Sequence, residues 1–92
     1  MDLLTKSQLA DLRYALLGEA VNARTVALSA EMLLRRVIRT RLLDFEVSVK
    51  QADDTLSELH ARGFIRVVAN PLGDTPYYQA TPEGELALRK GA

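Results

Sequence analysis

Apolar residues recur at helical spacing in three successive segments of the chain. The first segment covers residues 6 to about 22, and its apolar face carries Leu9, Leu12, Leu16 and Ala20. The second covers residues 30 to about 39, with an apolar face of Ala30, Leu33, Leu34, Val37 and Ile38. The third covers residues 49–62, where one stripe consists of Ala52, Leu56 and Leu59. Spacings of three and four residues predict three amphipathic helices.

Capping residues mark the ends of these helices. Two pairs have the spacing of a capping box, in which each side chain bonds the backbone N–H of the other residue: Thr5 with Gln8, and Ser48 with Gln51. Ser29 is the expected N-cap of the second helix, and Gly63 follows the third helix where a left-handed residue ends it. Gly18 lies inside the first helix, where close contact with another helix would explain it. The residues of the first helix expected to face solvent are Asp11, Arg13 and Glu19.

The pattern changes to β after Gly63. Residues 64–68 are rich in β-branched and aromatic side chains, residues 70–74 have turn composition, and residues 77–80 are the expected return strand. Thr81 and Pro82 then favour the N-cap and first position of a last helix. A third short strand is expected at residues 25–28. The connection between the second and third helices is expected to plug the core with Leu42, Leu43 and Phe45. This order predicts an α+β fold.

Composition places the chain in a broad class. Its 92 residues are expected to form a single domain over residues 1–92. Twelve basic residues balance twelve acidic ones, so any electrostatic site must come from local clustering. The chain has no Cys, and no apolar run of the signal-peptide or membrane-spanning kind is present, so we expect a cytoplasmic protein without a membrane partner.

The chain lacks the residue sets of catalysis and metal binding. His60 is the single histidine, and a packed or half-exposed side chain is the expected role for it. Asp53 and Asp54 are adjacent on a helix and point about 100° apart, so they cannot form a metal pair. No phosphate-cradling glycine loop is present. We therefore expect no enzyme activity, no metal and no cofactor. Of Tyr77 and Tyr78, which alternate on a strand, one should pack inward and the other outward.

The second helix carries an asymmetric cluster of positive charge. Arg35, Arg36 and Arg39 share the face opposite the apolar one, and Arg41 and Lys50 lie nearby in the sequence. Four arginines within seven residues of a neutral chain suit a helix that clamps phosphates. The other interpretation is a solvated face paired with carboxylates of the same chain, namely Glu31, Asp44 or Glu46.

Two stretches resemble known proteins. The run LSELHARGFI, then a hairpin, then YYQATPEGELAL is similar to the end of winged helix-turn-helix domains, with their "L..L...G.I" and "LT..G...L" segments. The stretch SAEMLLRRVIRTRLLDFEVSVKQADDTLSELHARGFI resembles small winged-helix proteins of Mu-like phages and prophages. The chain departs from them in lacking a glycine near Asp44. The resemblance implies a three-helix core, a two- or three-stranded antiparallel β-wing and a C-terminal helix.

The resemblance also implies a function. A small protein of this kind binds double-stranded DNA as a transcriptional regulator, with the third helix in the major groove, the second crossing the backbone and the hairpin beside them. The DNA contacts expected on that basis are Arg35, Arg36, Arg39, Arg41, Ser48, Lys50, Gln51, Ser57 and Arg66. A homodimer is expected through the first and last helices, which offer Leu3, Leu4, Tyr14, Leu86 and Leu88.

Some residues favour a different function. The outward face of the third helix is expected to carry Lys50, Asp54, Ser57 and Ala61, with Gln51 and Glu58 at its edges. Carboxylates at Asp53 and Asp54 repel phosphate, and the hairpin tip, residues 70–75, has no Lys or Arg. The alternative is a winged-helix protein-interaction module of phage or prophage origin that does not bind DNA.

Overall fold

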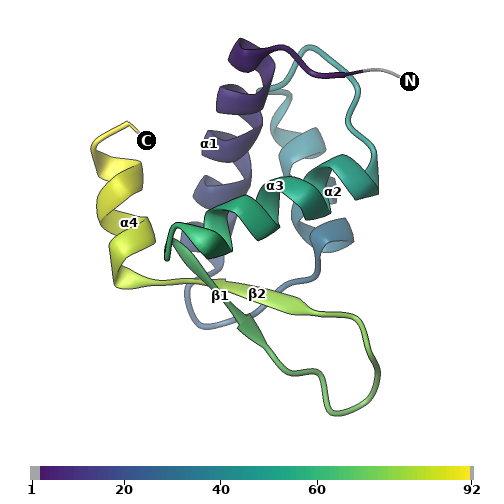
Figure 1. Ribbon diagram of the computed structural model, residues 1–92, viewed down its shortest axis with the longest axis vertical. Helices are drawn as coiled ribbons and strands as arrows, with labels where there is room; N and C mark the ends of the chain where they lie inside the picture. Colours follow the sequence, from purple (N-terminus) through teal and green to yellow (C-terminus); the bar gives the residue numbers. More distant parts are fainter. Residues whose placement is uncertain (1–2, 92) are drawn as a thin grey trace.

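The computed structural model describes residues 3–91, which contain four helices and two strands (Figure 1). The helices are α1 (Lys6–Ala23), α2 (Ala30–Thr40), α3 (Val49–Ala61) and α4 (Pro82–Arg89). Strands β1 (Ile65–Val68) and β2 (Tyr77–Ala80) form an antiparallel hairpin between α3 and α4. The predicted α+β class, the order of the elements and the C-terminal helix are confirmed. The predicted boundaries agree to within one residue for most elements.

Local side-chain bonds fix where each helix begins. Both expected capping boxes are present: the N–H of Thr5 donates to Gln8 Oε1 at 2.9 Å, and that of Ser48 donates to Gln51 Oε1 at 2.9 Å. Ser29 and Thr81 accept from the third residue of their helices. Gly63 has φ +80°, the left-handed conformation expected after α3.

The core lies where α1, α2 and α3 meet. Helix α3 crosses α1 and α2 and packs against both (Figure 1). The largest side chains that are fully buried there come from all three helices and β1: Leu12, Leu16, Leu17, Leu33, Val37, Leu56, Leu59 and Ile65. The expected apolar stripes of α1, α2 and α3 are therefore confirmed, except at Leu9, which is only half-buried, and at Ile38.

The end of α2 differs from the expectation. Ile38 is 61% exposed and Leu42 is 67% exposed, although both were predicted to be buried. Arg41 adopts a left-handed conformation with φ 56°, which ends α2 and turns the chain away from the core. Because of this turn Leu42 stays outside the core.

The rest of the connection packs only in part. Leu43 and Val47 lie against the core and Phe45 is half-buried, so the part of the connection that fills the core consists of Leu43 and Val47.

On the other side of α2, the expected third strand contributes a single bridge. Leu28 exchanges two backbone hydrogen bonds with Tyr78, of 2.9 and 2.8 Å. Ser29 caps α2, so that pairing does not continue past Leu28.

Helix α4 packs beside α1 (Figure 1). Leu88 reaches toward Gly18 of α1, and both Leu4 and Leu88 lie against the core. Part of the apolar surface expected to serve a homodimer is therefore used within one chain. Leu3, Tyr14 and Leu86 remain exposed.

Candidate nucleic-acid interface

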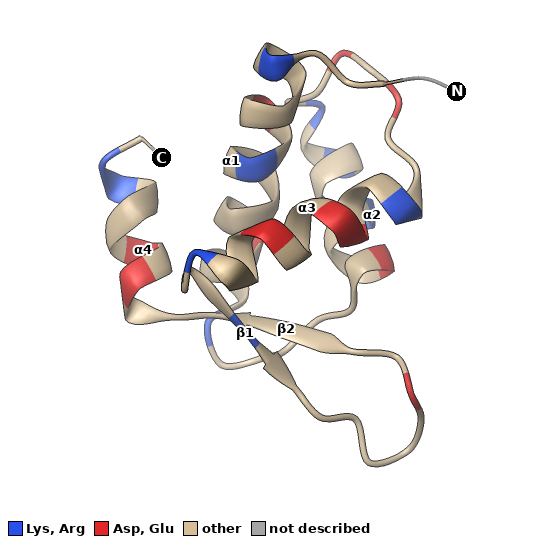
Figure 2. Cartoon of the chain, in the orientation of Figure 1, with Lys and Arg blue, Asp and Glu red and all other residues tan. Residues whose placement is uncertain are grey.

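The outward face of α3 carries the expected residues. Lys50, Asp54, Ser57 and Ala61 are exposed, and Gln51 and Glu58 at its edges are half-buried. Lys50 and Asp54 are one turn apart, and Lys50 Nζ lies 3.1 Å from Asp54 Oδ2. The two opposite charges therefore offset each other on this face. Figure 2 shows the resulting pattern, with acidic positions along α3 and basic positions toward its two ends.

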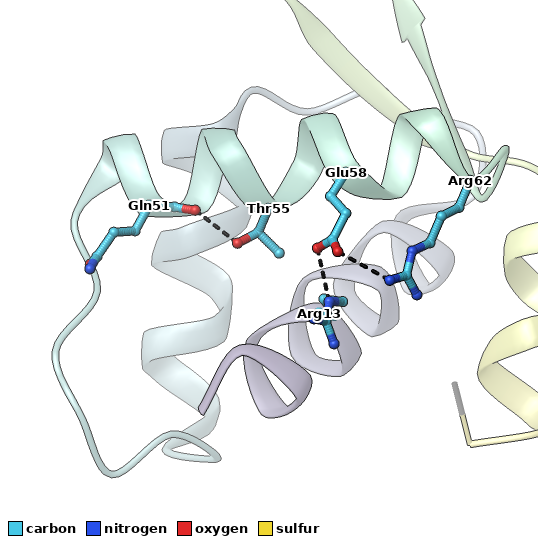
Figure 3. Close-up of polar contacts among 5 residues, drawn as sticks. All are labelled: Arg13, Gln51, Thr55, Glu58 and Arg62. Atoms are coloured by element: carbon cyan, nitrogen blue, oxygen red, sulfur yellow. Dashed lines mark hydrogen bonds and ion pairs between the residues drawn. The ribbon is translucent and has the colours of Figure 1, made fainter. Parts of the chain in front are cut away.

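Glu58 is held between two arginines. Arg13 Nε of α1 donates to Glu58 Oε2 at 2.9 Å, and Arg62, which follows α3, donates to Glu58 Oε1 at 3.1 Å (Figure 3). The hydrogen bond from Arg13 is the main reason that the pKa of Glu58 is lowered, and Arg62 adds to it. Arg13 was expected to face solvent, but this bond to α3 holds its side chain at only 25% exposure. Glu19, also expected in solvent, is half-buried, whereas Asp11 is exposed.

Asp53 does not belong to the outward face. Its Oδ1 accepts a hydrogen bond of 2.8 Å from the hydroxyl of Tyr78 on β2. Tyr78 is buried and Tyr77 is half-buried, which agrees with one tyrosine packing inward. Burial of Tyr78, followed by its bond to the Asp53 carboxylate, raises its pKa to about 12. Of the two acidic residues that argued against a DNA-facing α3, one is thus committed to the hairpin.

The arginines of α2 fall into two groups. Arg35 is bound to Glu31 one turn earlier, at 2.7 Å between Arg35 Nη2 and Glu31 Oε1. Arg36, Arg39 and Arg41 are exposed and form no ion pair or hydrogen bond through their side chains with any residue in the range 3–91. We call the four arginines 35, 36, 39 and 41 the basic patch.

Carboxylate pairing accounts for only one member of the basic patch. Glu31 holds Arg35, but Asp44 and Glu46 pair with no arginine among the described residues. The interpretation of this surface as an internally neutralised helix face therefore holds for Arg35 and fails for the other three.

A groove separates the end of α2 from the start of α3. It has a volume of about 990 Å³ and is lined by Leu3, Leu34, Ile38, Arg41, Leu43, Phe45, Glu46, Val47, Ser48, Lys50, Gln51 and Asp54. It brings together four of the expected DNA contacts, namely Arg41, Ser48, Lys50 and Gln51. The other five do not line it. We call this feature the α2–α3 groove.

The hairpin contributes little positive charge. Arg66 on β1 is exposed, and its guanidinium donates to Gln79 Oε1 on β2 at 2.7 and 3.1 Å. The tip is an Asn70 turn, in which the N–H of Leu72 donates to Asn70 Oδ1 at 3.0 Å. Leu72 is 94% exposed, and Asp74 is the single charged residue of the tip.

The sequence patterns predicted neither the exposed leucine at the hairpin tip nor the α2–α3 groove. Clustering of Leu43, Phe45 and Val47 in one short connection was the signal that could have indicated the groove.

Other chemistry has little support in the described part of the chain. His60 is exposed, and its Nδ1 lies 3.3 Å from the carbonyl oxygen of Ile65. Residues 3–91 contain no group of three or more His, Asp or Glu side chains that could hold a metal ion. Within the same residues, no helix is both long and apolar enough to cross a membrane.

No protein-family model matches this chain, and no curated protein is detectably similar to it.

Proposed function

We propose that this chain is a small DNA-binding protein of the winged helix-turn-helix type that acts as a transcriptional regulator. The observation that carries the proposal is the state of the basic patch: Arg36, Arg39 and Arg41 are exposed and have no carboxylate partner in residues 3–91. Exposed guanidinium groups without internal partners are available for bidentate contact with phosphate.

The arrangement of elements supports the same proposal. Helices α2 and α3 pack against one another, and the hairpin follows α3 directly (Figure 1). In such an arrangement α3 enters the major groove while α2 lies over the phosphate backbone. Lys50, Gln51 and Ser57 of α3 would contact bases or phosphates, with Ser48 at its N-cap. Arg66 is the single cation of the hairpin, residues 64–80, that could reach a flanking phosphate.

A titration of labelled random duplex, followed by fluorescence anisotropy at several salt concentrations, tests the proposal. The variant replaces Arg36, Arg39 and Arg41 together by Ala. Each phosphate contact contributes about 0.9 to the slope of log affinity against log salt, so the variant should bind more weakly and its slope should be shallower by about 2.7.

A matched control removes the same charge from another surface. Replacing Lys6, Arg89 and Lys90 by Ala also deletes three exposed cations, and it should leave affinity and slope close to those of the wild type. A folded basic-patch variant that binds like this control would contradict the proposal. Circular dichroism of both variants shows whether they are folded.

A protein-interaction module that does not bind DNA is the second candidate. The exposure of Leu72 on a hairpin tip without cations favours it, as does the exposure of Ile38 and Leu42 beside the α2–α3 groove. Apolar surface of this kind suits a protein partner better than a phosphate backbone. Wild-type protein that fails to bind duplex at micromolar concentration and low salt would favour this candidate over the first.

A further inference from the structure

The α2–α3 groove offers an apolar surface that residues 3–91 leave open. Leu34, Leu43 and Val47 lie along it as core or near-core residues, and Ile38 stands at its side with 61% exposure. Single exposed leucines are ordinary, but adjoining apolar side chains in a concave surface mark a place where something docks. The groove also has charge at its margin: among the described residues Arg41 and Glu46 have no ion-pair partner, while Lys50 pairs with Asp54.

The hairpin tip has the opposite shape, and its one charge is opposite to that of Arg41. It projects away from the helices (Figure 1), and Leu72 within it is 94% exposed. Asp74 is the one charged residue within the tip, and it forms no ion pair with residues 3–91. The tip therefore presents an exposed leucine beside an unpaired carboxylate, and the groove presents apolar side chains with an unpaired guanidinium at Arg41.

We propose that the hairpin tip of one copy of this chain docks in the α2–α3 groove of a second copy. Leu72 would contact the apolar side chains of the groove, and Asp74 would meet Arg41. Every copy carries both the tip and the groove, so two copies can exchange tips around a two-fold axis and close the assembly as a dimer. The formal net charge of 0 at pH 7 means that no long-range repulsion opposes this association.

The size of the contact sets its strength. The six residues of the tip, 70–75, in a groove of about 990 Å³ cover less surface than a stable interface of standard size. The dimer should therefore be weak, with a dissociation constant in the upper micromolar range. This proposal does not depend on whether the chain binds DNA.

Sedimentation velocity without DNA, over a concentration series, tests the contact. The average sedimentation coefficient of the wild type should rise with concentration. Leu72→Ser and Ile38→Asp should each weaken association about 10-fold or more, since each removes an apolar group from the centre of the contact. Both positions are exposed in the monomer, so both variants should fold. A wild type that stays monomeric throughout the series would overturn the proposal.

A control separates this contact from the expected dimer of the first and last helices. Leu86 is 51% exposed on α4, so Leu86→Ser removes an apolar side chain from that other surface. It should leave self-association unchanged. If Leu86→Ser abolishes association and Leu72→Ser does not, the contact lies on α1 and α4, and the tip-to-groove proposal is wrong.

A charge exchange tests the pairing itself. Asp74→Arg places two arginines together at each contact, and Arg41→Asp places two carboxylates together, so each variant alone should associate at least about 3-fold more weakly. An equal mixture of the two variants restores an opposite pair at both contacts of a mixed dimer, and should associate as the wild type does. A mixture no stronger than its components would contradict the pairing of Asp74 with Arg41.

Discussion

Two glycines lie inside helices of this chain, and their surroundings give them opposite effects on stability. A Cβ added to Gly84, in the first turn of α4, would lie 2.0 Å from the backbone oxygen of Phe64. That oxygen also accepts the N–H of Thr81 at 3.1 Å, so it cannot move aside without losing the bond. Gly84→Ala should therefore lower the free energy of unfolding by about 3 kcal/mol, measured by urea denaturation.

Gly18 is the matched control for that substitution. A Cβ there would lie 3.9 Å from Leu88 Cδ1, which is ordinary van der Waals contact. Gly18→Ala should raise the free energy of unfolding by about 0.5–1 kcal/mol, because alanine loses less backbone entropy than glycine in a helix. Helix α4 therefore packs beside Gly18 but not closely enough to require glycine, so the expected close contact does not explain this residue. A Gly84→Ala variant as stable as the wild type would show that α4 is not held against Phe64.

Sequence patterns predicted the conformation of a residue well where it depends on neighbours in the sequence, and poorly where it depends on distant parts of the chain. Gly63 follows from the end of an apolar stripe, and its left-handed conformation is confirmed. Arg41 adopts the same region of backbone space without being glycine. That conformation costs a non-glycine residue roughly 1–2 kcal/mol, which packing elsewhere can offset. The residue type at position 41 therefore does not reveal this left-handed conformation. The role of Gly84 was also missed, because its neighbour Phe64 is twenty residues away.

At the scale of elements, capping was predictable and side-chain contacts between elements were not. The bonds of Thr5 and Ser48 close within three residues, so the spacing of the sequence contains them. The bonds from Arg13 to Glu58 and from Tyr78 to Asp53 span 45 and 25 residues. They depend on how helices and strands pack, which periodicity does not specify. They also remove Glu58 and Asp53 from the set of unpaired acidic residues on α3.

The bond from Tyr78 to Asp53 predicts a dependence of stability on alkaline pH. Tyr78 has a folded-state pKa of about 12, above the ordinary value of 10.0 that it regains on unfolding. The folded protein therefore holds the neutral phenol more strongly, and this contribution is fully present below pH 10. It should be lost at roughly 1.4 kcal/mol per pH unit as pH rises from about 10 to about 12.

Urea denaturation of the wild type and of Tyr78→Phe measures this loss. The difference in stability between the two proteins should shrink as pH rises above about 10, because only the wild type has the buried phenol. In Asp53→Asn the dependence should weaken but persist, since burial is the larger cause of the raised pKa. Parallel pH profiles for the wild type and Tyr78→Phe would contradict the assignment.

At the scale of the whole molecule, balanced composition conceals unequal pairing of charge. Arg13, Arg24, Arg62 and Arg89 are tied to Glu58 or Glu85, whereas three arginines of the basic patch are unpaired in residues 3–91. Clustering of arginine was visible in the sequence, but its pairing was not. The exposed end of α2 and the projecting hairpin tip depend on how the elements are arranged in space. Apolar periodicity does not specify that arrangement, so it predicted Ile38 to be buried and gave no sign of the groove.

Arg41, Lys50 and Gln51 link the two proposals made for this protein. All three line the α2–α3 groove, where a second copy would dock, and all three are proposed contacts of duplex DNA. Two partners that need the same side chains weaken each other by the same factor, because binding linkage is reciprocal. Adding duplex should therefore dissociate the dimer. Leu72→Ser, which keeps these three side chains but self-associates more weakly, should bind duplex at least as tightly as the wild type.

Sedimentation with a fluorescently labelled duplex at low salt measures this competition. The labelled complex should contain no tip-docked dimers, so Leu72→Ser should leave its sedimentation coefficient unchanged at every protein concentration. A larger complex that forms with the wild type and disappears with Leu72→Ser would mean that DNA and the second copy bind together. The tip and the duplex would then occupy different parts of the groove. Arg41→Asp would show which of the two partners Arg41 contacts, because it would weaken either self-association or DNA binding and leave the other intact.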